Sequence, residues 1–132
     1  MKTFPLNLRP VILVDVKLSG PKGSRFVKMI LDTGASFTMA SPQILSEIGC
    51  DPVLSSNVKK ICTASSVEFV PFVKLPVVEA LGYKVGYLDI VAHLMPTSIP
   101  AEGLLGLNFL SRFNLDLQFL NKRMIIADEM SA

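Results

Sequence analysis

The sequence predicts a mainly β protein folded as a closed β-barrel with one or two short helices. Short apolar runs rich in β-branched residues recur along the chain, and turns containing glycine or proline separate them. Apolar residues at helical spacing occur in one short stretch, between a Ser-Pro start signal and a glycine stop. The two halves of the chain also repeat one pattern, in which strand, turn and strand lead to a glycine-containing loop. Such a repeat is typical of an internally two-fold β-barrel.

Composition limits the classes of function that the chain can serve. With 132 residues, it is expected to form a single domain, 1–132, with a core at about 11–127 and an arm or edge strand at 1–10. Half of the residues are apolar and 18% are charged, which argues against disorder. The net charge is +2 and the basic residues are scattered, so we expect no nucleic-acid partner.

Targeting and metal signals are weak as well. No apolar run approaches the ~18 residues of a membrane span, and the N-terminus lacks the pattern of a signal peptide. We therefore expect a cytoplasmic protein without a membrane partner. One histidine and two dispersed cysteines, Cys50 and Cys62, do not make a metal-ligand set, and we expect both thiols to be reduced.

The first half of the chain reads as a hairpin, a short strand and a helix. The predicted strands are 11–18, 24–31 and 37–40. A turn signal at 19–23 joins the first two strands. Ser41 resembles a helix N-cap, Pro42 suits the first helical position, and Gly49 supplies the stop. The sequence therefore predicts one helix of about two turns after the third strand.

The second half predicts another hairpin, a long strand and a closing strand pair. The hairpin has arms at 58–61 and 67–75, and we expect Pro76, Gly82 and Gly86 to interrupt the chain after it. Alternation then predicts a half-buried strand at 87–95, with His93 beside Asp89 as a surface or satisfied residue. An apolar strand from 103 reaches a glycine and a short helix to about 112, and strands near 113–117 and 124–126 close the fold.

The stretch 31–36, Leu-Asp-Thr-Gly-Ala-Ser, is the centre of the functional hypothesis. It ends a buried strand with an ionisable carboxylate, Asp32, at the point where a core meets a cleft. Gly34 lets the backbone turn tightly or approach another chain. A plain strand-end turn is the alternative, since all three residue types are common in turns. In the repeat, Gly34 corresponds to Gly106, 72 positions later, and the second half has no acid at this place.

These motifs resemble those of the retropepsin-like aspartic proteases, which include retroviral proteases and their single-domain bacterial relatives. The stretch 31–36 matches the active-site loop of that family. Residues 103–108, Gly-Leu-Leu-Gly-Leu-Asn, match its second signature, which includes Leu105 and Gly106. The segment 63–66 falls where the family carries its flap hairpin. The resemblance covers about residues 11–127 and implies a barrel of the acid-protease type with one lobe per chain.

The resemblance also implies a mechanism. Asp32 would be the catalytic acid and base, and a second copy of Asp32 would come from a homodimer, because the chain carries one Asp-Thr-Gly. Two adjacent carboxylates share one proton; the ionised one activates a water and the protonated one assists the scissile amide. Thr33 would hydrogen-bond across the dimer axis, and Gly34 would leave room for substrate. No cofactor is implied.

The remaining implied roles concern substrate binding and pH. Thr63, Ala64, Ser65 and Ser66 would form the flap tip that closes over an extended peptide. Ala35 supplies no hydroxyl beside Asp32, so we expect a weakly acidic to near-neutral optimum. Two alternatives remain at this point: a dimeric peptide-binding module of the same fold with little turnover, and an unrelated β-barrel in which Asp-Thr-Gly is only a turn.

Overall fold

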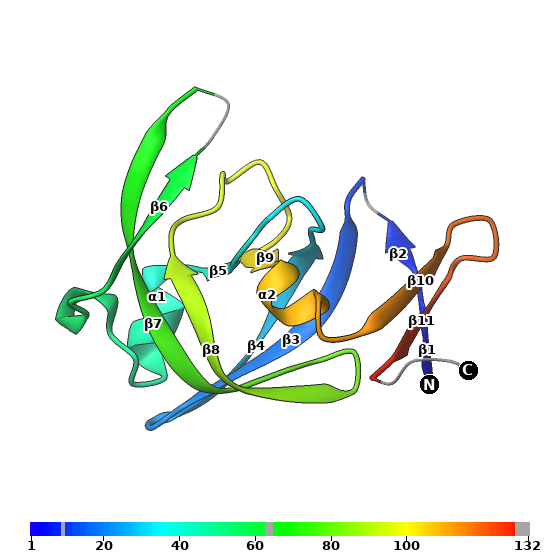
Figure 1. The fold of residues 1–132 in the computed structure, drawn as a ribbon, viewed down its shortest axis with the longest axis horizontal. Coiled ribbons are helices and arrows are strands. Elements are labelled where there is room, and N and C mark those ends of the chain that lie inside the picture. Colours follow the sequence, from blue (N-terminus) through cyan, green and yellow to red (C-terminus); the bar gives the residue numbers. More distant parts are fainter. Residues whose placement is uncertain (9, 63–64, 129–132) are drawn as a thin grey trace.

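The computed structural model describes residues 1–8, 10–62 and 65–128. Most of its regular elements are strands, as expected (Figure 1). In chain order the elements are β1 (Lys2–Pro5), β2 (Asn7–Leu8), β3 (Ile12–Gly20), β4 (Gly23–Leu31), β5 (Thr38–Ala40), α1 (Pro42–Glu47), the 3₁₀ turn η1 (Pro52–Leu54), β6 (Val58–Cys62), β7 (Val67–Ala80), β8 (Tyr83–Ala92), β9 (Gly103–Leu105), α2 (Leu107–Leu110), β10 (Asn114–Gln118) and β11 (Arg123–Ala127).

The larger sheet closes on itself. Its strand order is β2-β3-β4-β9-β5-β8-β7-β6, and an additional pairing joins β3 to β7. The strands β3, β4, β9, β5, β8 and β7 therefore form a complete hydrogen-bonded ring, with β2 and β6 attached outside it. This ring confirms the predicted closed β-barrel. Among the described residues, no helix is both long enough and apolar enough to cross a membrane.

Alternating apolar residues explain the first hairpin of the barrel. In β3, Val14, Val16 and Leu18 are buried, while Asp15 between them is exposed. Side chains of a strand alternate between its faces, so every second residue of β3 points into the core. β4 pairs with β3 in antiparallel register, Val16 opposite Val27, and contributes its own buried side chains to the same core. The predicted hairpin is confirmed, and its strands meet across a tighter turn than 19–23.

The two helices begin where the sequence indicates. The Ser41 hydroxyl accepts a hydrogen bond from the N–H of Ile44, and Pro42 takes the first position of α1. Ile44 and Leu45 are buried against the barrel. α2 begins directly after Gly106 and buries Phe109. Both helices thus contribute buried side chains to the core of the barrel.

The expected interruption after residue 75 is confirmed at Gly82, which lies in the turn between β7 and β8, and is wrong at Pro76 and Gly86. β7 runs through Pro76, and β8 runs through Gly86. The ladder between them pairs Leu75 with Leu88 and then Val77 with Gly86, so Pro76 falls at a step without a registered pair. Proline has no N–H to donate, and this gap in the ladder accommodates it. β8 also ends at Ala92, so His93 lies beyond the strand and not at a strand position beside Asp89.

A separate three-stranded sheet joins the two ends of the chain. Its order is β1-β11-β10, all antiparallel, with Phe4 of β1 opposite Met124 of β11. Figure 1 shows this sheet beside the barrel, with the N-terminus at its lower end. Residues 1–10 were expected to form either a loose arm or an edge strand, and β1 is an edge strand. β11 occupies the centre, and strands of the same chain flank it on both sides.

Candidate active site

Two parallel strands bring the predicted active-site loop and the second signature together. β4 and β9 pair in parallel register, with Leu31 opposite Leu105. Both strands are buried at this point, and both end here. The N–H of Asp32 donates to the carbonyl of Leu105 over 3.0 Å, which extends the ladder by one residue. The two motifs are therefore adjacent, as the internal repeat of the sequence indicated.

The Asp32 carboxylate is oriented by its own loop. The N–H of Gly34 donates to Oδ1 of Asp32 over 2.9 Å, and the N–H of Ala35 donates to the Asp32 carbonyl over 3.3 Å. A Cβ atom at Gly34 would lie 3.2 Å from Oδ1, closer than ordinary contact. Asp32 is half-buried, whereas Thr33 and Gly34 are exposed. The loop thus presents one carboxylate at a surface that remains open to a ligand or to another chain.

Gly106 allows the second signature to pack against this loop. A Cβ atom at this position would lie 2.5 Å from the carbonyl oxygen of Phe37 and 2.9 Å from that of Ala35. Directly after it, the N–H of Leu107 donates to Ala35 O over 2.8 Å, and that of Asn108 donates to Ser36 O over 3.2 Å. The start of α2 therefore holds the backbone of residues 35–37, and only glycine fits at the point of contact.

A buried polar network fixes the same loop from its other end, and the sequence reasoning missed it. Oδ1 of Asn108 accepts hydrogen bonds from the N–H of Thr38 at 2.9 Å and from its hydroxyl at 2.8 Å. The Thr38 hydroxyl accepts from the N–H of Gly106 at 3.1 Å, and Nδ2 of Asn108 donates to Asp89 O at 2.8 Å. Thr38 is fully buried. A hydroxyl residue inside an apolar run, together with the asparagine that ends the second signature, was the available signal.

Asp32 lies where two pockets meet. The first has a volume of about 670 Å³ and the second about 530 Å³. Asp32, Met39 and Leu104 line both pockets, and Asp32 is the only carboxylate among the described residues that line either one. The first pocket is otherwise mainly apolar, and its lining residues include Leu8, Pro10, Val11, Ile12, Ile30, Met95, Pro96 and Ile99.

The hairpin of β6 and β7, which we call the β6–β7 hairpin, borders the second pocket. Its ladder runs from Val58 opposite Pro71 to Cys62 opposite Val67. Of the predicted flap-tip residues, Thr63 and Ala64 lie outside the described residues, while Ser65 and Ser66 are exposed. The hairpin residues that line the second pocket are Lys60, Ile61 and Cys62. Ser65 and Ser66 do not line this pocket.

A lysine fixes the base of this hairpin to the barrel. Nζ of Lys59 lies 3.4 Å from Oδ2 of Asp89, and it also lies over the rings of Phe37 and Phe72, at 4.7 and 4.3 Å from their centroids. Nζ of Lys74 lies 2.9 Å from Oδ1 of the same Asp89, although the two groups are not aligned as a hydrogen bond. Asp89 thus faces these lysines, and its predicted neighbour His93 contacts Glu68 instead.

Neither the cysteines nor the acidic residues that the structure describes form a metal site. Both Cys50 and Cys62 are free thiols, and burial raises the pKa of the Cys50 thiol above its ordinary value. Within residues 1–8, 10–62 and 65–128, no three His, Cys, Asp or Glu side chains come together as a ligand set. The chemistry that the site offers is that of an accessible carboxylate between two pockets.

Comparisons with known proteins agree with this geometry. The family described as "gag-polyprotein putative aspartyl protease" matches residues 14–112, well over half of the chain. Among solved structures, the chain is similar to a retropepsin-like aspartic protease from Rickettsia conorii, with a TM-score of 0.69 and 18% identity over 94% of this chain and 87% of that chain. None of the curated proteins compared with the chain matches it. The fold is that of the retropepsins, and the chain belongs to the family of gag-polyprotein aspartyl proteases, which are retropepsin-like.

Proposed function

We propose that this chain is an aspartic endopeptidase that hydrolyses extended peptide segments as a homodimer. The observation that carries the proposal is the position of Asp32. It is the one carboxylate among the described lining residues of two adjoining pockets, and its loop is fastened from both ends. A peptide that crosses Asp32 could place neighbouring side chains in the two pockets.

The reaction requires a second carboxylate beside the first. Two carboxylates in contact cannot both ionise, so the pair holds one shared proton. The ionised carboxylate takes a proton from the attacking water, and the protonated one polarises the scissile carbonyl and later protonates the leaving nitrogen. In the parallel register of β4 and β9, Gly106 follows Leu105 as Asp32 follows Leu31, and it has no side chain; the sequence repeat, which aligns Gly106 with Gly34, also puts no acid opposite Asp32.

The second carboxylate is therefore supplied by a second copy of Asp32 across a two-fold axis. The exposure of Thr33 and Gly34 supports this arrangement, because both are accessible for contacts between two loops. Thr33 would bond across the axis, and Gly34 and Ala35 would line the floor beneath the peptide. Because β11 already has a neighbour on each side, a partner could extend the three-stranded sheet only beyond β1 or β10.

The β6–β7 hairpin would serve as the flap, with the segment 63–66 at its tip. Its position beside the second pocket supports this role, since a strand-like peptide bound below it would be enclosed. The apolar lining of the first pocket favours a bulky hydrophobic side chain next to the cleaved bond. A cytoplasmic location, the absence of a cofactor and the single-domain organisation remain predictions of the sequence.

The test compares the wild-type chain with Asp32→Asn on denatured casein and on a peptide library, from about pH 4 to 7.5. Asp15→Asn is the matched control, because Asp15 is an exposed carboxylate on β3 that lines neither pocket. We expect cleavage by the wild type and by the control, inhibition by a statine-type compound, and none by Asp32→Asn. Sedimentation should show activity only in dimeric fractions, with a weakly acidic to near-neutral optimum.

Two other outcomes would change the proposal. Equal cleavage by Asp32→Asn would assign the activity to another group or to a contaminant. A folded dimer that binds peptides without cutting any of them would identify a peptide-binding module of the same fold.

A further inference from the structure

A histidine and a glutamate join the β6–β7 hairpin to the wall of the first pocket. His93 directly follows β8 and lines that pocket together with Asp32. Its Nε2 lies 3.2 Å from Oε2 of Glu68, which belongs to β7 and stands opposite Ile61 in the hairpin. The N–H of His93 also donates to the carbonyl of Ala40 over 3.1 Å, so its backbone is fixed to β5.

The hydrogen-bond partners of His93 determine how many protons the contact needs. Nδ1 lies 2.9 Å from the carbonyl oxygen of Leu94, which can only accept, so Nδ1 must carry a proton. An ionised Glu68 can also only accept, so Nε2 must then carry a second proton. If Glu68 is protonated instead, its hydroxyl donates to Nε2. A neutral imidazole and an ionised carboxylate hold one ring proton between them. In both cases the two hydrogen bonds require a second proton.

We propose that His93 and Glu68 form a proton-dependent tie that holds the β6–β7 hairpin against the wall of the first pocket. When the extra proton is bound, both hydrogen bonds form and the hairpin is fixed. When it is lost, one of the two contacts lacks a donor, and the hairpin can move away from the pocket. Both are positioning residues, and the proposal of how they act on catalysis rests on the proposed function.

The other charged groups near this pair are an aspartate in the same pocket and two lysines that pair elsewhere. Asp32 shares the first pocket with His93. On the neighbouring strands, Lys59 and Lys74 are both directed to Asp89. Imidazoles change charge between about pH 5 and 8, and the single histidine of the chain is this one. The two side chains are 38% and 48% exposed, so solvent screens the contact and its effect should be modest.

Hydrogen exchange of the hairpin amides tests the tie without any need for activity. After correction for intrinsic rates, we expect the amides of β6 and of the start of β7 to be about threefold more protected at pH 5.5 than at pH 8 in the wild type. Glu68→Gln keeps the side-chain length but supplies no carboxylate, and it should abolish this difference.

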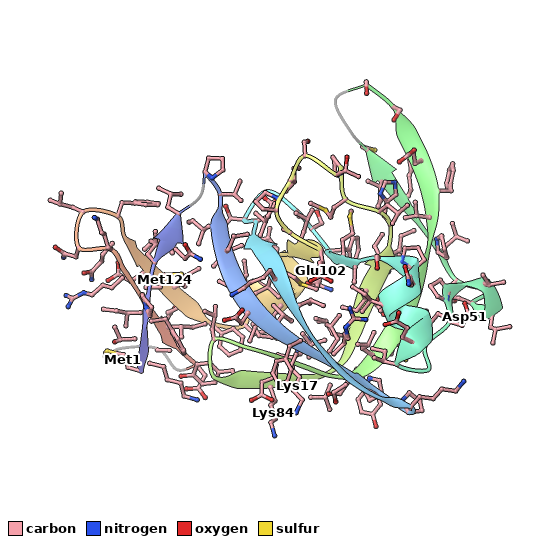
Figure 2. The ribbon with its side chains drawn as sticks, turned by 180° about the vertical axis from the view of Figure 1, so that it is seen from behind. Met1, Lys17, Asp51, Lys84, Glu102 and Met124 are labelled. Atoms are coloured by element: carbon pink, nitrogen blue, oxygen red, sulfur yellow. The ribbon has the colours of Figure 1, made fainter. Side chains whose placement is uncertain are left out.

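Glu79→Gln is the matched control, since Glu79 lies on the same strand. Its register partner is Lys84, which Figure 2 places at the lower edge of the molecule, away from the β6–β7 hairpin. This control should show the same pH-dependent protection of the hairpin amides as the wild type. With a cleavable peptide, Glu68→Gln should flatten the pH dependence of KM and leave that of kcat unchanged.

The outcomes separate the tie from the protease activity. Equal pH dependence of exchange in the wild type and Glu68→Gln would overturn the tie, even if the chain is an active protease. A pH-dependent difference that Glu68→Gln removes would support the tie, even if no peptide is cleaved.

Discussion

Replacing Gly106 by alanine is the sharpest test of how the Asp32 loop is held. The added Cβ would lie 2.5 Å from the Phe37 carbonyl oxygen, 2.6 Å from its carbon and 2.9 Å from the Ala35 carbonyl oxygen. These are backbone atoms, and the shortest distance falls about 0.9 Å below ordinary contact at 3.4 Å. The loop must therefore move as a whole, because no flexible side chain can give way.

The cost follows from this displacement. Overpacking of a close-packed site lowers the free energy of unfolding by about 1–3 kcal/mol. With a slope of ~1–3 kcal/mol per M urea, this shifts the unfolding midpoint by about 1 M. A displacement of about 1 Å at a catalytic group can lower kcat/KM by ~100-fold. We therefore expect a large loss of peptide cleavage in a variant that still folds. Urea unfolding followed by circular dichroism and a peptide assay provide the two measurements.

Gly86→Ala is the control for this experiment. Gly86 lies in β8, and the nearest atom to an added Cβ is Pro76 O at 3.5 Å, which is an ordinary contact. Its unfolding free energy should stay within about 0.5 kcal/mol of the wild type. If Gly106→Ala unfolds at the same urea concentration as Gly86→Ala and cleaves peptide equally well, the close approach of α2 to the loop does not position Asp32.

Three further predictions concern other parts of the fold. Asn108→Ala leaves two buried donors of Thr38 without an acceptor, so the free energy of unfolding should fall by about 2–4 kcal/mol. Thr38→Val should lower the free energy of unfolding less in the Asn108→Ala background than in the wild type. Equal losses in the two backgrounds, measured by urea unfolding, would refute the network. Burial raises the pKa of the Cys50 thiol, so a smaller fraction of Cys50 is thiolate, the form that reacts. Iodoacetamide at pH 8 should therefore label Cys50 more slowly than the exposed Cys62. Equal labelling rates by mass spectrometry would contradict this. Phe4→Ala should lower the unfolding free energy by about 1–2 kcal/mol, because Phe4 packs on the core, and an unchanged urea midpoint would exclude the N-terminal strand from the cooperative unit.

The elements that depend on short-range sequence patterns were predicted correctly. The β3–β4 hairpin follows from alternating apolar residues, and α1 follows from Ser41 and Pro42 at its start. The adjacency of Asp32 and Leu105 followed from the internal repeat. In each case the residues that decide the structure lie within a few positions of one another, or recur at equivalent places in the two halves.

Contacts between distant residues that the internal repeat does not relate could not be predicted from the sequence. Thr38 and Asn108 are 70 positions apart, and although a hydroxyl inside an apolar run was a signal, no local feature identifies Asn108 as its partner. Pro76 was expected to end a strand, but the opposite strand leaves an unpaired step that admits it. His93 was expected beside Asp89, yet tertiary contacts direct it to Glu68 and direct Asp89 to lysines. These positions depend on how the barrel closes.

The three-stranded sheet sets the order in which the molecule can be completed during synthesis. β1 pairs Lys2 with Ile126 and Pro5 with Arg123, so its partner strand is made more than a hundred residues later. Contacts of such high sequence separation form late in folding, because a long loop must close first. β1 therefore has no partner strand until residues 123–127 have been made. If the second copy docks on this sheet, the carboxylate pair can assemble only after residues 123–127 have been made and have paired with β1, so the proposed activity begins only from that point of synthesis.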